Sequence, residues 1–181
     1  MMKIFMTIVL AVLCSAANVV AQEIVIPDYS AHILTPKAPD TPRINGPKVT
    51  GATPGADFLY RIPATGVRPM TFSAEGLPKG LKLDESTGVI TGKVKKAGTY
   101  KVTLKAENSL GSNEKELRIV IGDRVALTPP LGWNSWNCWG NSVSQELVES
   151  SAKAMVESGL ADYGWSYINI DDGWQGVGGG E

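Results

Sequence analysis

The sequence is poor in cysteine, and this excludes a disulfide-stabilised fold. Of the two cysteines, Cys14 lies in the signal peptide predicted below, so the mature chain keeps only Cys138. A single thiol cannot form an internal disulfide bond, and we expect stability to come from packing. Because a lone cysteine beside Trp139 is more often a small buried residue than a nucleophile, we assign Cys138 no catalytic role.

Histidine is scarcer still, and neither sign of charge dominates. His32, the only histidine, lies in a proline-rich segment without a catalytic partner nearby, so neither a Ser-His-Asp site nor a zinc site is predicted. Net charge is −1, from 17 basic and 18 acidic residues, with no basic block. This balance gives no electrostatic basis for binding nucleic acid or an anionic membrane.

No apolar run is long enough for a stable membrane anchor, and the clearest one lies at the amino end. Ile4 to Leu13 follows the positive charge of Lys3, and small residues lead up to Ala21. We predict a signal peptide over residues 1–21, cleaved near Ala21/Gln22, and a mature chain in the periplasm or outside the cell. Leu13 is too bulky for a usual lipobox, although lipidation of Cys14 stays open.

The segment after the signal peptide is rich in proline. Five of the eleven prolines lie between Gln22 and Pro47, where they disfavour both helix and central strand. We expect an extended arm over residues 22–42, with one edge strand at most, at residues 23–26.

Residues 43–123 show short alternating runs separated by glycine and proline. The clearest run is 100–106, which is apolar at every second position, and further candidate strands cover 58–62, 70–74 and 117–121. Asp84 to Gly88 is predicted to be a tight turn. Strands at this spacing are typical of an all-β sandwich.

Four motifs in this region resemble the immunoglobulin-like (cadherin-like) modules of bacterial surface and secreted enzymes. They are Gly76-Leu-Pro-Lys-Gly-Leu-Lys-Leu-Asp84, Thr87-Gly-Val-Ile-Thr-Gly92, Gly98-Thr-Tyr100 and Ala106-Glu-Asn108. The resemblance implies an architecture rather than a chemistry. Some cadherin-like relatives bind calcium at domain junctions, but the acids here (Asp84, Glu85, Glu107 and Asp123) are not concentrated in one loop. We expect no metal or other cofactor, with calcium as the minor alternative.

All five tryptophans lie beyond residue 130, where the composition changes. Leu131 to Trp136 is a candidate strand, and Ser144 is a plausible cap for a helix that reaches about Ser158, with Gly159 after it. A second strand follows at Tyr167 to Ile170. The order predicts one βαβ unit with parallel strands.

Two adjacent carboxylates, Asp171 and Asp172, follow that second strand. Neighbouring residues of a strand point to opposite faces, so the pair can serve one ligand only if the strand ends and the backbone turns there. Gly173 permits such a turn. From these residues alone, an ordinary acidic loop remains an equal alternative to a binding site.

Two segments stand out here, Thr128-Pro-Pro-Leu-Gly-Trp-Asn-Ser-Trp-Asn137 and Tyr167-Ile-Asn-Ile-Asp-Asp-Gly-Trp174. Together they resemble the opening of the α-galactosidases of glycoside hydrolase family 27 (clan D). The resemblance implies the first two strands of a (β/α)8 TIM barrel and the retaining hydrolysis of terminal α-linked galactose, or of N-acetylgalactosamine or arabinopyranose. It also implies that Asp171 and Asp172 bind the sugar 4- and 6-hydroxyls and that Trp136 packs against the sugar. The partner would then be an α-galactoside oligosaccharide or polysaccharide.

Two features depart from that family. Many relatives have a cysteine directly after the acidic pair, bonded to a cysteine after strand one, whereas Gly173 stands here and Cys138 has no partner. A complete barrel needs about 250 residues, and the family's two catalytic aspartates lie on later strands, beyond residue 181. We therefore assign no catalytic residue within the chain and expect it to be inactive alone.

The sequence thus predicts a multidomain protein: an all-β immunoglobulin-like sandwich over 43–123, then the first βαβ unit of a truncated barrel over 124–181. The open unit is expected to be disordered or prone to association, because its sheet edge and helix face are uncovered. The alternative is a non-enzymatic secreted module that binds glycan or protein, with or without stiffening by calcium.

Overall fold

The computed structural model describes residues 30–32, 36–124 and 126–175. The predicted signal peptide, Cys14 and the expected edge strand at 23–26 lie outside these residues. The chain divides into two units, and in the first, residues 1–36, the 3-10 turn η1 (Ser30–His32) is described. Residues 37–181 form the second unit, to which all further elements belong. Within the described ranges, no helix is long and apolar enough to cross a membrane.

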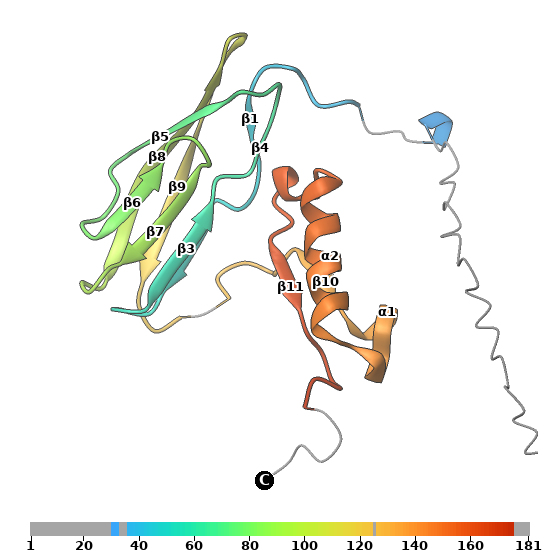
Figure 1. Cartoon of the computed structure of the whole chain (residues 1–181). Helices are drawn as coiled ribbons and strands as arrows, with labels where there is room; N and C mark the ends of the chain where they lie inside the picture. The colour runs from blue at the N-terminus through green and yellow to red at the C-terminus, as the bar shows by residue number, and fades with distance from the viewer. Residues whose placement is uncertain (1–29, 33–35, 125, 176–181) are drawn as a thin grey trace, which may run out of the picture. The chain divides into compact units, whose positions relative to one another are not determined.

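The first part of the second unit is a β-sandwich (Figure 1). One sheet has the order β2-β9-β8-β5, the other β3-β7-β6, and β1 pairs with β4 at one side. The strands are β1 (Arg43–Ile44), β2 (Val49–Ala52), β3 (Asp57–Arg61), β4 (Ala64–Thr65), β5 (Thr71–Glu75), β6 (Leu81–Asp84), β7 (Val89–Lys93), β8 (Gly98–Asn108) and β9 (Gly111–Ile121). All pairs are antiparallel except β2 with β9.

The period-2 pattern explains how β8 and β9 build the core. On β8, Val102 and Leu104 are buried while Lys101 is exposed, and on β9 the buried residues are Leu117, Ile119 and Ile121. Alternation places all these apolar side chains on one face, against Phe58 and Ile90 of the other sheet. The predicted strands and the sandwich are confirmed.

The turn between β6 and β7 is closed by the carboxylate of Asp84. Its Oδ1 atom accepts hydrogen bonds from the backbone N–H of Ser86 (2.9 Å) and of Thr87 (3.1 Å) and from the Ser86 hydroxyl (2.7 Å). These bonds, first of all that from the Ser86 hydroxyl, lower the pKa of Asp84. Among the described residues, no three His, Cys, Asp or Glu side chains lie close enough to share a metal ion.

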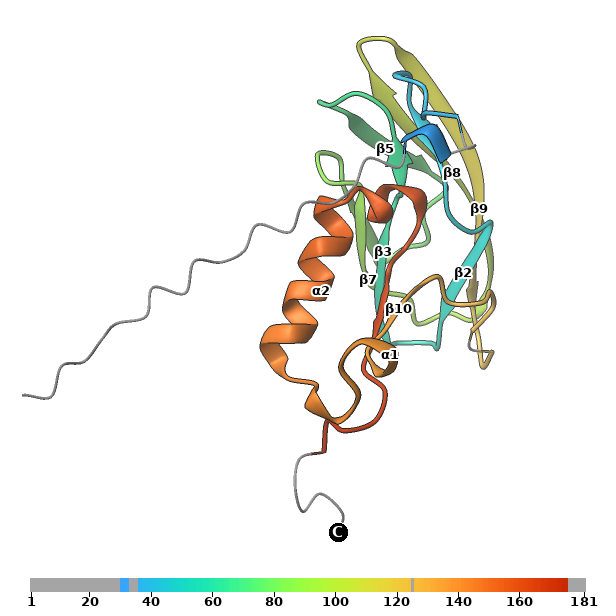
Figure 2. The same ribbon diagram turned by 90° about the vertical axis from the view of Figure 1, so that its right-hand side faces the viewer.

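The second part, from Gly132 onward, is a βαβ unit with an additional short helix and two 3-10 turns (Figure 2). It consists of β10 (Gly132–Asn134), α1 (Trp136–Trp139), the 3-10 turn η2 (Gly140–Ser142), α2 (Gln145–Glu157), the 3-10 turn η3 (Leu160–Tyr163) and β11 (Tyr167–Asn169). The strands β10 and β11 pair in parallel, as predicted. The hydroxyl of Ser144 accepts from the backbone N–H of Leu147, and Gly159 adopts φ +82° after the helix, so both helix ends lie where the sequence placed them.

The first strand of this unit is shorter than expected. It ends at Asn134, and Trp136 begins the short helix α1 instead of extending the strand. The cause is local: the side-chain oxygen of Asn134 accepts from the backbone N–H of Trp136 at 2.9 Å, which turns the chain out of the strand. Cys138, on α1, is exposed, so the expectation that it is buried is wrong.

The βαβ unit has little core of its own. Met155 is the buried hydrophobic residue of α2, whereas its neighbour Val156 is 64% exposed. Most of the large exposed hydrophobic side chains belong to this unit, namely Trp136, Val156, Leu160, Tyr163, Tyr167, Ile170 and Trp174. The sandwich therefore has a complete hydrophobic core, whereas the βαβ unit leaves much of its apolar surface exposed. We call it the open unit below.

Candidate functional site

The site begins with the register of the two parallel strands. Gly132 pairs with Tyr167, Trp133 with Ile168, and Asn134 with Asn169, so both strands end at the same level. The residues that follow them, starting with Ser135 and Ile170, therefore leave the sheet side by side. In parallel α/β folds, this edge of the sheet is where ligands bind.

Asp171 is held in place by residues from the end of β10. The side-chain amide of Asn134 donates to Oδ2 of Asp171 at 2.9 Å, and the backbone N–H of Asp171 donates to the Ser135 hydroxyl at 2.9 Å. Ser135 is fully buried, and its own N–H donates to the carbonyl of Asn169 at 3.0 Å. The carboxylate of Asp171 is thus oriented by contacts across the strand pair while the residue stays exposed.

Asp172 lies in the turn that leaves the strand. Its backbone N–H donates to Oδ1 of Asp171 at 2.9 Å, and its own carboxylate accepts from the backbone N–H of Gly173 at 2.8 Å. Gly173 has φ +85°, as its predicted turn requires, and a Cβ atom there would lie 3.0 Å from the Cα of Asn141. The strand does end before the acidic pair, so both carboxylates lie on one exposed loop.

Trp136 starts α1 two residues after the end of β10, and its side chain is 43% exposed. Its backbone is tied to the same network, because Asn134 accepts from the Trp136 N–H and donates to Asp171. The amide of Asn134 therefore connects the two segments on which all three predicted site residues lie. A half-exposed indole offers an apolar face to a ligand.

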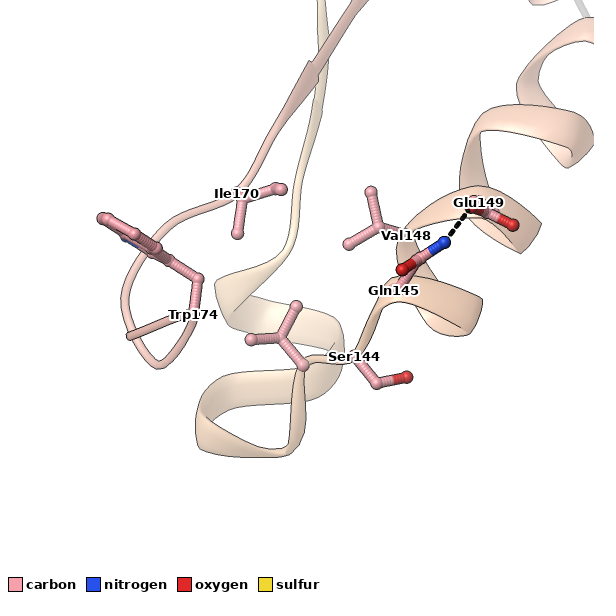
Figure 3. A pocket seen from close by; sticks show the side chains of 7 residues that line it. Ser144, Gln145, Val148, Glu149, Ile170 and Trp174 are labelled. Atoms are coloured by element: carbon pink, nitrogen blue, oxygen red, sulfur yellow. Dashed lines mark hydrogen bonds between the residues drawn. The ribbon is translucent and has the colours of Figure 1, made fainter. Parts of the chain in front are cut away.

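A cavity of about 390 Å³ opens between α2 and the loop after β11 (Figure 3). In Figure 3, Trp174 and Ile170 lie on one side and Val148 and Gln145 of α2 on the other. The residues that line it are Val143, Ser144, Gln145, Val148, Glu149, Ile170 and Trp174. Its walls are mainly apolar, and it does not include Asp171, Asp172 or Trp136.

Reasoning from the sequence found the two aspartates but missed Asn134 and Ser135, which hold Asp171. A signal was present, because both are polar residues that directly follow the first predicted strand. In a parallel pair, residues just past the two strand ends become neighbours. The cavity beside Trp174 had no comparable signal, because it depends on how α2 packs.

Comparison with known protein families identifies the sandwich. The family described as "Putative Ig domain" matches residues 41–122. The sandwich is thus an immunoglobulin-like module, in agreement with its strand order and core.

Comparison with individual proteins points to α-galactosidases. The chain is 42% identical to the alpha-galactosidase of Coffea arabica over 66 residues, which are 36% of this chain and 18% of that enzyme. Two crystal structures from Bacteroides fragilis are also similar. One, described as a "putative alpha-galactosidase", has 51% identity and a TM-score of 0.74 over 79% of this chain. The other, a "putative alpha-galactosidase/melibiase", has 55% identity and a TM-score of 0.72 over 77% of it.

The matched region is only a small share of each relative's own length. The chain covers 31% of each Bacteroides fragilis chain and 18% of the Coffea arabica enzyme. The chain therefore spans less than a third of the length of these α-galactosidase relatives. The structural matches cover more of this chain than residues 41–122 make up, so they extend beyond the immunoglobulin-like module.

Proposed function

We propose that this chain is the amino-terminal part of a secreted, retaining α-galactosidase of glycoside hydrolase family 27 (clan D). The observation that carries the proposal is the acidic pair Asp171 and Asp172 just past the aligned ends of two parallel strands. A (β/α)8 barrel builds its site at that edge. The similarity to α-galactosidases supports the same reaction class.

In the proposed enzyme, Asp171 and Asp172 accept hydrogen bonds from the 4- and 6-hydroxyls of galactose, and Trp136 packs against the sugar. Ionised carboxylates are strong acceptors with about four lone-pair sites each. Asn134 and the Asp172 N–H use only part of the capacity of Asp171. Both carboxylates are exposed, so hydroxyl groups of a ligand can reach them.

The nucleophile and the acid/base of the proposed enzyme come from later strands of the barrel. In retaining glycosidases these two carboxyl groups flank the scissile bond about 5–5.5 Å apart. Asp171 and Asp172 are consecutive residues of one loop, joined by a hydrogen bond from the N–H of one to the carboxylate of the other. The two carboxylates are therefore suited to bind one side of a sugar. They are not placed to act on the scissile bond from two opposite sides.

Export is part of the same proposal. The apolar run before Ala21, with Lys3 in front of it, has the composition of a signal peptide. An exported enzyme would meet oligosaccharide or polysaccharide galactosides in the periplasm or outside the cell. The immunoglobulin-like module would precede the barrel in the mature protein.

The test is a comparison of two proteins on nitrophenyl α-galactoside. We expect no turnover by the 181-residue chain and turnover with retained anomeric configuration by the product of the whole reading frame that encodes it. Nitrophenyl derivatives of N-acetylgalactosamine and arabinopyranose, assayed in parallel, identify the sugar. Turnover by the 181-residue chain, or inversion by the longer product, would refute the proposal.

A second candidate is a non-enzymatic module that binds glycan or protein. It is favoured by one observation, namely that the sandwich has a complete core while the βαβ unit exposes its apolar residues. Glycan binding by the purified chain that survives replacement of both Asp171 and Asp172 by alanine would support this candidate. A melting temperature that rises with calcium would support its calcium-stiffened form.

A further inference from the structure

Three side chains of the sandwich converge on one turn of the βαβ unit. Arg61 and Arg68 each place Nη2 near Oδ1 of Asp162, at 2.7 Å and 3.2 Å. The side-chain amide of Asn45 donates to the backbone carbonyl of Asp162 at 2.9 Å. Asp162 lies in η3, so the turn is held through both its side chain and its backbone.

Two of the three side chains, those of Arg68 and Asn45, also form hydrogen bonds within the sandwich. Arg68 also donates to the carbonyl of Ala64 at 3.2 Å, and the amide of Asn45 also donates to the hydroxyl of Thr65 at 3.3 Å. Both acceptors belong to β4, and the Asn45 N–H donates to the carbonyl of Pro63 at 2.8 Å. For Asn45 and Arg68, little side-chain freedom is therefore left to be lost when η3 binds.

A half-buried lysine of β9 also stabilises the loop that contains Asn45. Lys115 of β9 donates to the carbonyls of Asn45 (3.0 Å) and Gly46 (2.6 Å). Burial, and secondly the positive charges of Lys48 and Arg43, lower the pKa of Lys115. The loop at Asn45 and Gly46 is thus anchored to the sheet as well as to η3.

The backbones approach closely beside these polar contacts. Gly164, the residue after η3, is buried, and a Cβ atom on it would lie 3.0 Å from the Cα of Gly46. Gly164 also has φ +101°, which residues with a side chain rarely adopt. Two glycines therefore permit the loop and the turn to touch where the ion pairs form.

We propose that Arg61, Arg68 and Asn45 form a docking site for η3, with Asp162 as the residue it recognises, and that the sandwich is thereby an internal scaffold for the βαβ unit. This role differs from glycan binding and from catalysis. It rests on contacts within the chain, so it does not depend on the proposed activity.

The position of the docking site defines what the scaffold can do. From η3 the chain passes Gly164 into β11, so the sandwich holds the amino end of this strand. Asp171 and Asp172 lie past its carboxyl end. The sandwich therefore acts on the candidate site by fixing the strand rather than by contacting a ligand. The open unit, which buries few apolar residues, gains from such an anchor.

The charges at the docking site are partly exposed, and this limits their contribution. The side chains of Arg61, Arg68 and Asp162 are 39%, 41% and 30% exposed. One such pair contributes little by itself, because solvent screens it. Here a single carboxylate meets two guanidinium groups next to a buried backbone contact, so reversing its charge opposes both arginines at once.

The distribution of tryptophan supplies the readout. All five tryptophans lie at or beyond Trp133, so their fluorescence reports on the βαβ unit and not on the sandwich. We expect Asp162→Arg to lower the melting midpoint of the tryptophan signal by roughly 3–8 °C in the purified chain. The matched control is Glu157→Arg, which reverses the charge of an exposed carboxylate at the end of α2 that pairs with Lys153 at 3.7 Å. It should shift the midpoint by about 1 °C at most.

Exchanging the charges of Asp162 and the two arginines distinguishes a loss of docking from local damage to η3. Asp162→Arg combined with Arg61→Asp and Arg68→Asp should recover at least half of the lost midpoint, because opposite charges again face each other. A midpoint for Asp162→Arg equal to that of Glu157→Arg would overturn the proposal. So would a loss that the exchange does not recover, since Asp162 would then matter only within its own turn.

Discussion

The side-chain amide of Asn134 lies 2.9 Å from Oδ2 of Asp171, and this hydrogen bond joins the ends of two parallel strands whose residues are 37 positions apart. The same amide accepts from the Trp136 N–H through its oxygen. Asn134 thus orients the carboxylate of Asp171, which follows β11. It also orients the start of α1, the helix after β10 that carries the indole of Trp136. Two of the three predicted ligand residues, Asp171 and Trp136, are therefore bonded to one uncharged residue.

Ser135 should be among the most sensitive positions of the βαβ unit. Its buried hydroxyl accepts from the backbone N–H of Asp171 at 2.9 Å, and Ser135→Ala leaves that donor without its acceptor. We expect a loss of about 1–3 kcal/mol in the free energy of unfolding, measured by urea titration of tryptophan fluorescence. Ser142→Ala, at an exposed position, is the control and should change it by less than about 0.5 kcal/mol. Equal effects of both variants would contradict the role of Ser135.

Gly173 should resist substitution for two reasons. Its φ of +85° is unfavourable for any residue with a Cβ atom, and that atom would lie 3.0 Å from the Cα of Asn141. We expect Gly173→Ala to destabilise the βαβ unit by about 1–3 kcal/mol. Gly122→Ala is the control, since a Cβ atom there meets no other group within 4 Å. A Gly173→Ala variant as stable as Gly122→Ala would show that the turn relaxes.

Two tyrosines of the sandwich should respond in opposite ways to loss of the hydroxyl. The Tyr60 hydroxyl is buried without a hydrogen-bond partner among the described residues, whereas that of Tyr100 donates to the carbonyl of Lys96 at 2.9 Å. Tyr60→Phe should therefore leave stability unchanged or raise it by up to about 1–2 kcal/mol. Tyr100→Phe should lower it by about 0.5–1.5 kcal/mol. Chemical denaturation monitored by circular dichroism measures both, and a clear loss in Tyr60→Phe would reveal an unrecognised partner.

The buried hydroxyl of Tyr60 should also make the fold less stable at alkaline pH. Burial raises its pKa to about 12. Because the hydroxyl ionises in the unfolded chain near its ordinary pKa but stays neutral in the fold, this group has no pH-dependent effect on stability below the ordinary pKa. Stability is lost as pH rises from that value towards the raised pKa. Tyr60→Phe should flatten this alkaline decline in melting temperature, and an unchanged profile would argue against burial of the hydroxyl.

The first turn of α2 should be sensitive to acid. The pKa of Glu146 is lowered by a hydrogen bond from the backbone N–H of Glu146 itself and by one from the side chain of Ser144. A carboxylate with a lowered pKa stabilises the fold above its ordinary pKa, and this stabilisation is lost as pH falls through the lowered value. Glu146→Gln should reduce the dependence of helix content on pH in that acidic range, and Ser144→Ala should reduce it less. Circular dichroism as a function of pH tests this, and identical curves for wild type and Glu146→Gln would contradict it.

The sequence was sufficient for the parts of the fold that follow from local periodicity. The alternation along 100–106 gave the core strand β8, and Ser144 and Gly159 marked the ends of α2. These features are determined within a few residues, so a short window contains the information. The acidic pair was recognised for the same reason, from an apolar strand followed by charge.

The contacts that join distant segments could not be obtained in this way. Asn134 looks like any polar residue at a strand end, and its pairing with Asp171 depends on the register of two strands. Asp162 has no periodic signal, yet it meets Arg61 across a separation of 101 residues. Asp40, placed in the extended arm, accepts from the backbone N–H of Val67 at 2.9 Å on the sandwich. Such pairings are set by tertiary packing, which propensities do not encode.

The proposed role of Asp171, binding a galactose hydroxyl, is tested most directly by the kcat/KM of the whole reading frame's product on α-galactoside. Loss of a charged acceptor for a sugar hydroxyl in Asp171→Asn should lower kcat/KM by about 10²-fold or more. The control Asp123→Asn, an exposed aspartate next to the sandwich, should retain the wild-type value. A fall in Asp171→Asn alone is the predicted result. Equal kcat/KM values for wild type and both variants would contradict the account.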